Sequence, residues 1–146
     1  MNFNANIELR KLDEYYPNSD LKHIFNKYRE EIILLVNAVE SAWKNKHLDK
    51  HNFDILFKGI ENSWAGIYYN IVGEQINLMI GKIVGIEELI TKGIKDKRWQ
   101  TRFNTVVIMK GIHNSEIQNK IIDLALKDKS KKVIEMANDV KNHYLN

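Results

Sequence analysis

Two clusters of basic residues are the part of this sequence whose residue types and spacing could bind a ligand. The clusters are related by an offset of 32 residues and consist of Lys95, Lys97, Arg98 and Arg102, and of Lys127, Lys129, Lys131 and Lys132. Ammonium and guanidinium groups that gather on one surface bind phosphates or acidic side chains. A solvated lysine-rich edge that only prevents end-to-end aggregation is the alternative interpretation.

Residues that could support catalysis are few. The chain has no cysteine, which excludes disulfides, thiolate metal sites and cysteine nucleophiles. The adjacent glutamates at 30–31 and 87–88 point to different faces of a helix and so do not form an acid–base pair. His47 and His51 are interpreted as solvated loop histidines, and there is no glycine-rich phosphate loop. We therefore expect no enzyme activity, no catalytic residue, no metal and no cofactor.

Helices must position the basic clusters, because apolar residues recur along the chain at spacings of three and four. One such stripe runs from Leu21 to Trp43, and one proline and seven glycines are too few for an all-β fold. Gly59, Gly93 and Gly111 follow lysines and are interpreted as helix ends. The 146 residues are expected to form a single all-α domain, 1–146. Eight helices are expected, at about 6–15, 20–46, 51–61, 64–84, 86–95, 98–111, 114–127 and 131–145.

Part of the chain repeats at an offset of 32 residues. Residues 89–97 align with residues 121–129, and Lys-Asp-Lys ends both segments. A weaker third copy, 56–64, shares Lys-Gly-Ile with 92–94. A helical hairpin cannot bury its own apolar face, so neighbouring hairpins must stack. We expect a short α-solenoid of three to four helical hairpins, and an irregular helical bundle is the alternative.

Equivalent turns lie side by side in a stacked solenoid. The turns near 96 and 128 would then bring the two basic clusters together into one basic ridge, made of the eight residues named above. This expectation follows from the repeat and not from composition alone.

The turn at 96–102 resembles the turn of HEAT-type repeats, in which an Asp between two helices is followed six residues later by an Arg. Asp96 and Arg102 hold these positions. The resemblance implies that Asp96 caps the second helix and that Arg102 reaches back to the turns of its own and the adjacent repeat. The second copy keeps Asp128 but has Ile134 in place of the arginine.

The stretch from residue 64 to the C-terminus also resembles the DNA alkylation-repair glycosylases built from HEAT-like repeats. Residues 64–74, WAGIYYNIVGE, look like their Trp-led helix, and residues 99–102 look like their Trp-x-x-Arg helix start. The family has a catalytic carboxylate where this sequence has Tyr68, and its Asp after the first Trp is Ala65 here. A tyrosine does not supply that negative charge at neutral pH. The resemblance therefore implies the scaffold and part of a binding surface, without glycosylase chemistry.

Two aromatic residues complete the candidate site. Trp99 lies inside the first basic cluster, where an exposed ring could stack on a base or anchor a protein interface. A buried Trp99 at the start of a HEAT-type second helix is the alternative. Tyr69 is offset from the apolar face of its predicted helix and could line a concave surface, whereas Trp43 continues an apolar stripe and is expected in the core.

The positive charge is confined to one half of the chain. Residues 1–64 have a net charge of −1 and residues 65–146 a net charge of +4. We expect a non-enzymatic module that binds and blocks an acidic protein partner, as an inhibitor or a toxin-immunity protein would. A nucleic-acid-binding protein on the repair-like scaffold is the alternative.

The chain shows no feature of a membrane or secreted protein. Its N-terminus has no apolar signal-peptide region, and no apolar run reaches the length that spans a bilayer. We expect a cytoplasmic protein with no membrane partner and no small-molecule substrate.

Overall fold

The computed structural model describes residues 3–15, 22–63, 69–111 and 115–144, and these residues form an all-α structure. The helices are α1 (Ala5–Tyr15), α2 (Lys22–Lys27), α3 (Arg29–Asn45), α4 (Lys50–Glu61), the π-helix η1 (Tyr69–Gly73), α6 (Glu74–Met79), α7 (Ile86–Ile94), α8 (Trp99–Ile108), α9 (Glu116–Ala125) and α10 (Lys131–Tyr144). None of these helices is long and apolar enough to cross a membrane.

Each of the eight ranges predicted from the sequence contains a helix, so the all-α prediction is confirmed. Two ranges differ in detail. The range 20–46 is divided at Tyr28 into α2 and α3, and the range 64–84 contains η1 and α6 in its described part. Helix α6 ends at Met79, and the turn after it includes Gly81, whose φ of 78° lies in the left-handed region that glycine adopts readily.

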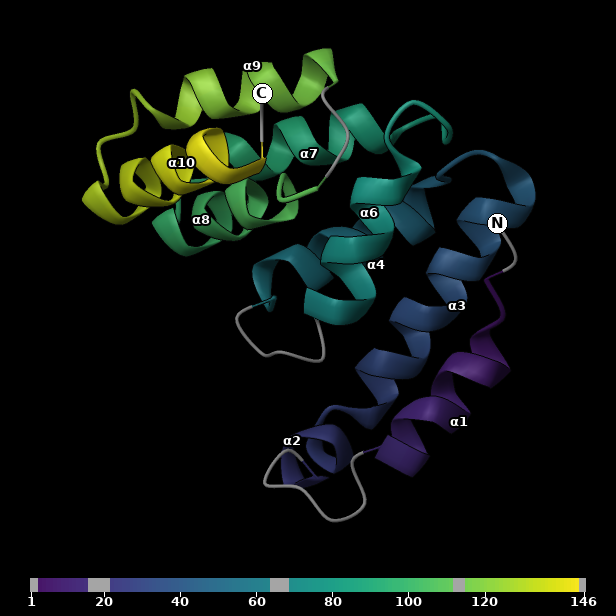
Figure 1. Ribbon diagram of the computed structural model, residues 1–146. Helices are drawn as coiled ribbons and strands as arrows, with labels where there is room; N and C mark the ends of the chain where they lie inside the picture. The colour runs from purple at the N-terminus through teal and green to yellow at the C-terminus, as the bar shows by residue number, and fades with distance from the viewer. Residues whose placement is uncertain (1–2, 16–21, 64–68, 112–114, 145–146) are drawn as a thin grey trace.

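The N-terminal helices pack on α3. Helix α1 lies along α3, which in turn packs against α4 (Figure 1). The backbone N–H of Ala5 donates to the Glu40 carboxylate at 2.6 Å, which ties the start of α1 to α3. Trp43 is buried, as predicted, and its indole N–H donates to Gln75 Oε1 at 2.9 Å. These contacts join α1, α3 and the α6 segment through one apolar core.

The C-terminal helices form two neighbouring hairpins, α7–α8 and α9–α10. Helix α7 packs against α9, and α8 packs against α10 (Figure 1). The apolar side chains between them are fully buried, as at Ile90, Val106, Ile121 and Val133. Burial of such side chains stabilises the folded state by about 1.5–3 kcal/mol each. The hairpins therefore hold together chiefly through their shared apolar interior.

Buried amide side chains connect successive helix ends. Asn104 Nδ2 donates to the carbonyl oxygen of Ile60 at 2.9 Å, and Asn77 Nδ2 donates to that of Ile108 at 2.8 Å. The last carbonyl groups of a helix have no partner within the helix, and an unpaired buried carbonyl is costly. Asn77 satisfies a carbonyl at the end of α8, and Asn104 adds to the Ser63 bond that the Ile60 carbonyl at the end of α4 also accepts. Both amides fix how the neighbouring helices approach these ends.

An isolated β-bridge joins the loops that precede α4 and α7. Leu48 N–H donates to the Val84 carbonyl at 2.9 Å, and Val84 N–H donates to the Lys46 carbonyl at 3.1 Å. No strand extends from this bridge within the described residues. It fixes the starting points of α4 and α7 relative to one another.

Gly93 lies inside α7 in its last turn, near the helix end that the sequence predicted, but it does not follow the helix as a C-terminal stop. A Cβ atom at Gly93 would overlap the hydroxyl of Thr105 on α8 and lie 3.3 Å from Thr105 Cβ. Gly59 likewise lies inside α4, where a Cβ atom would come within 2.7 Å of Leu35 and Val72. Both glycines are required by close helix packing, a role that helix-end rules do not reveal.

We predict that Gly93→Ala lowers the free energy of unfolding by about 1–3 kcal/mol, because the added methyl group forces α7 away from α8. Urea denaturation measures the loss. In the background of Thr105→Ala the same substitution should be less destabilising, because the overlapping side chain is gone. Strictly additive effects of the two substitutions would contradict this explanation.

Candidate binding surface

The turns before α8 and α10 have the same local structure. Asp96 Oδ1 accepts a hydrogen bond from the Arg98 N–H at 2.9 Å, and Asp128 Oδ1 accepts one from the Ser130 N–H at 2.8 Å. A side-chain oxygen that binds the backbone two residues ahead forms an Asx turn. The repeated Lys-Asp-Lys sequence therefore folds the same way twice.

Asp96 shapes this turn and does not cap α8 through its side chain, which corrects the role that the HEAT-type resemblance implied. The N-cap residue of α8 is Arg98, and it makes no side-chain capping bond. The carboxylate of Asp96 accepts from the backbone N–H of Arg98, the N-cap residue, and not from an N–H within the first turn of the helix.

Arg102 joins the two turns through four hydrogen bonds, an arrangement that we call the Arg102 clasp. Its Nη1 donates to the backbone carbonyls of Asp96 at 2.8 Å and Lys97 at 2.9 Å, in its own turn. Its Nε and Nη2 donate to the two carboxylate oxygens of Asp128, at 2.8 and 3.2 Å, in the neighbouring turn. The planar guanidinium group suits such a forked contact, which a lysine would not reproduce. Arg102 thus reaches both turns.

The two charged side chains of the clasp are almost inaccessible to solvent. The Arg102 side chain is 8% exposed and the Asp128 side chain 10%. Arg102 was predicted as a contact residue, but its guanidinium already donates four hydrogen bonds within the chain. Direct contact of Arg102 with a partner stays a prediction that this geometry does not favour.

The surroundings of Asp128 favour its charged form. Burial by itself raises the pKa of this carboxyl group. The hydrogen bonds from Arg102 and Ser130, together with the positive charges of Arg102 and Lys129, outweigh burial and hold the pKa below its ordinary value. Asp128 is therefore a carboxylate at neutral pH, and the folded state is more stable when it is ionised.

Four lysines line an open hollow at the clasp. We call it the four-lysine hollow, and its lysines are Lys95, Lys97, Lys127 and Lys129. The same hollow is lined by Ile94, Asp96, Arg102 and Asp128. All four lysines are exposed, and none forms an ion pair within 4.0 Å in the described part of the chain. The two turns therefore lie side by side, with their lysines on one surface.

The remaining basic residues of the predicted ridge have partners inside the chain. Arg98 Nη2 donates to Glu61 Oε2 at 3.1 Å and to Thr101 Oγ1 at 2.9 Å, which ties the turn back to the end of α4. Lys131 Nζ lies 3.7 Å from Glu135 Oε1 on the exposed face of α10. These residues contribute charge to the surface but are less available than the four lysines of the hollow.

Trp99 is half-buried, which is intermediate between the exposed ring and the buried core residue considered from the sequence. Its ring packs edge-on against Phe103, with 6.1 Å between the ring centroids. Lys132 Nζ lies 5.1 Å from the Trp99 ring centroid, a distance suited to a cation–π contact. The contact places the start of α10 next to the start of α8 and covers part of the indole ring.

Several predicted aromatic positions are not placed by the structure. Tyr69 belongs to η1, but its side chain lies outside the described part, and Trp64 and Tyr68 lie outside the described residues altogether. The prediction that Tyr69 lines a binding surface therefore stays a prediction. The same holds for the Trp-led helix of the glycosylase resemblance.

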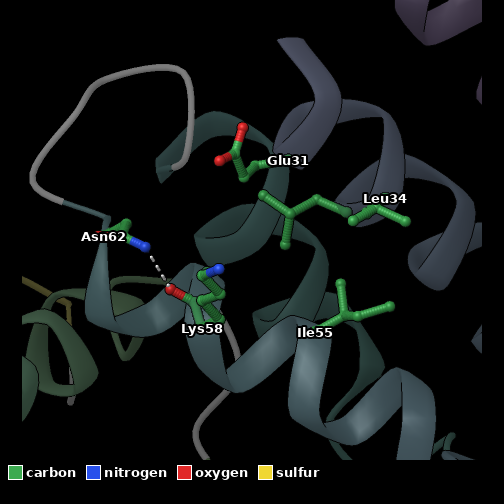
Figure 2. Close-up of a pocket in the computed structure, with 7 residues that line it drawn as sticks. Glu31, Leu34, Ile55, Lys58 and Asn62 are labelled. Atoms are coloured by element: carbon green, nitrogen blue, oxygen red, sulfur yellow. Dashed lines mark hydrogen bonds between the residues drawn. The ribbon is translucent and has the colours of Figure 1, made fainter. Parts of the chain in front are cut away.

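A second, smaller hollow lies between α3 and α4 (Figure 2). Leu34, Leu35 and Ile55 give it an apolar lining, and Glu31 of α3 and Lys58 of α4 add charged groups. Leu34 is 50% exposed, which is high for a leucine. Sequence reasoning did not identify this hollow. The only signal was Leu34, an apolar residue that lies beside the stripe formed by Ile32 and Leu35.

The described residues contain no group of three His, Cys, Asp or Glu side chains arranged to hold a metal ion. His47 and His51 are both exposed. Every buried side-chain nitrogen and oxygen in the described part has a hydrogen-bond partner, so no buried polar atom there points to a missing ligand.

Comparison of the chain with models of known protein families, with curated proteins and with solved structures found no match. The resemblances to HEAT-type repeats and to the alkylation-repair glycosylases therefore rest only on the residues that suggested them.

We predict that Asp128→Asn lowers the free energy of unfolding by about 3 kcal/mol, because it leaves the buried Arg102 guanidinium without its negative partner. Asp123→Asn is a matched control, since Asp123 is exposed on α9, and it should change stability by less than about 0.5 kcal/mol. Urea denaturation at pH 7 measures both. Equal effects of the two substitutions would show that the clasp does not stabilise the fold.

The difference in the free energy of unfolding between wild type and Asp128→Asn should depend on pH. Because the pKa of Asp128 is lower in the folded than in the unfolded chain, its contribution is fully present above about pH 4, the ordinary range for aspartate. It is lost as the pH falls through the folded-state pKa. Urea curves recorded downward from pH 5 should therefore converge for the two proteins. A difference in stability that stays constant to the lowest pH would contradict the conclusion that ionised Asp128 stabilises the fold.

Proposed function

We propose that this chain is a non-enzymatic binding module whose four-lysine hollow engages an acidic surface on a protein partner and blocks it, as an inhibitor or a toxin-immunity protein does. The observation that carries the proposal is the convergence of Lys95, Lys97, Lys127 and Lys129 on one hollow. Residues 32 positions apart in sequence share this surface because the two turns lie side by side.

The charges of the hollow are available for a partner. None of its four lysines is in an ion pair within the described residues, so binding need not break an existing pair there. Exposed charges of this kind chiefly accelerate encounter and select partners of opposite charge. Acidic side chains of a protein surface are the complementary groups.

We infer that the hairpins form a short α-solenoid of HEAT-like units. Helices α4, α7 and α9 contact one another in succession, and the segment η1–α6, α8 and α10 do the same. Each Asp turn joins one helix of the first series to one of the second. This order supports three stacked hairpins, and repeats of this kind offer large contact surfaces to proteins.

Nucleic acid is the second candidate partner, and the same observation favours it. Four unpaired lysines on one surface would also neutralise phosphates, and binding of that kind weakens steeply as salt rises. Asp96 and Asp128 line the same hollow, and their negative charge opposes phosphates and acidic side chains alike, so the salt-series experiment below separates the two partners.

The proposal predicts that replacing the four lysines of the hollow by glutamine weakens partner binding by roughly tenfold or more without unfolding the chain. The variant combines Lys95→Gln, Lys97→Gln, Lys127→Gln and Lys129→Gln. A control with the same change in net charge combines Lys44→Gln, Lys50→Gln, Lys82→Gln and Lys120→Gln, all exposed positions elsewhere. The partner is captured on the wild-type chain from the cells that make it, and the affinity of each variant for it is then measured.

A blocking role is tested on the captured partner. Its activity should fall when equimolar wild-type chain is added and should recover with the hollow variant but not with the control. A short DNA duplex measured in parallel over a salt series separates the second candidate. Tight, salt-sensitive binding of the duplex with no protein captured would replace the proposal by the nucleic-acid alternative.

A further inference from the structure

We propose that the Arg102 clasp makes the two lysine-bearing turns into one binding site, so that Arg102 and Asp128 act as positioning residues for the acidic partner. This inference rests on the proposed function. Arg102 and Asp128 are the two least exposed charged residues at the hollow. They would act by holding the two turns in place and not by touching the partner.

The clasp holds the backbone next to every lysine of the hollow. The two backbone carbonyls that accept from Arg102 belong to Lys97 and to Asp96, the neighbour of Lys95. In the other turn, Lys127 and Lys129 flank Asp128, whose carboxylate accepts from the same guanidinium. One planar group therefore fixes the relative position of both turns.

A fixed spacing increases affinity without adding contacts. When two binding elements are held in the geometry that a partner requires, the second engages at a high effective concentration. Less conformational freedom is then lost on binding. If the turns moved independently, each pair of lysines would bind with only its own low affinity.

The negative charge of Asp128 allows a test, because a positioning role and a purely electrostatic role predict opposite effects of Asp128→Asn on binding. Asp128 is a negative charge in a surface proposed to bind a negative partner, so on charge alone Asp128→Asn would strengthen binding. If Asp128 acts through the clasp, the same substitution weakens binding. Asparagine can keep the turn bond from Ser130, but its NH₂ group opposes one of the two Arg102 donors.

Asp96→Asn is the matched control for this test. Asp96 lines the same hollow and holds the same place in the first turn, so its substitution removes the same charge. Arg102 binds the backbone carbonyl of Asp96 and not its carboxylate, so the clasp stays intact. The turn bond to Arg98 also needs only a side-chain oxygen, which asparagine retains.

The experiment measures the binding of a fluorescent poly-L-glutamate peptide by anisotropy, at low salt and at a temperature where circular dichroism shows each variant folded. We expect Asp128→Asn to bind about tenfold more weakly than wild type. Asp96→Asn should bind equally or more tightly. Binding by Asp128→Asn that is as tight as wild type, or tighter, overturns the inference while the proposed function stands.

Two further outcomes are decisive. If Asp128→Asn does not fold, Arg102→Lys takes its place, because it keeps the net charge but cannot bind both turns with one planar group. Weaker binding by folded Arg102→Lys supports the inference, and unchanged binding overturns it. If wild type itself binds neither the peptide nor a captured acidic protein, the proposed function fails, and this inference fails with it.

Discussion

The buried ion pair between Arg102 and Asp128 is the interaction on which the surface of this protein depends. Apolar packing holds α7, α8, α9 and α10 together, and the clasp adds a direct polar link between the turns at their ends. One guanidinium group binds the carbonyls of one turn and the carboxylate of the next. The lysines of the hollow are attached to these same backbone segments.

The Arg102–Asp128 pair differs from an apolar contact in the geometry that it specifies. Removing two charges from water opposes much of their mutual attraction, so an apolar pair of similar volume would often be as stable. An apolar pair would not bind the carbonyl groups of Asp96 and Lys97, and it would hold no particular register between the turns. The charged pair therefore links the two turns in one arrangement, which an apolar pair of the same volume would not do.

The sequence was informative where local rules decide the structure. Helical periodicity predicted the helical ranges, and the repeated Lys-Asp-Lys predicted two equivalent turns, because an Asx turn needs only one residue type at one position. The contact of Arg102 with both turns was implied by the HEAT-type resemblance, but the other contacts between distant residues had no such signal. The pairing of Arg98 with Glu61 and the packing of Gly93 against Thr105 depend on how helices approach one another. The covering of Trp99 by Lys132 likewise became visible only in three dimensions.

The most direct test of the central claim is an NMR measurement of the Arg102 side chain. Its Nε–H is bound to Asp128 and nearly excluded from solvent. The account predicts that this proton exchanges slowly with water and shows nuclear Overhauser contacts to residues of the turn at Asp128. The exposed Arg10 provides the reference for rapid exchange. An Arg102 proton that exchanges as fast as that of Arg10, with no contact to the second turn, would contradict the account.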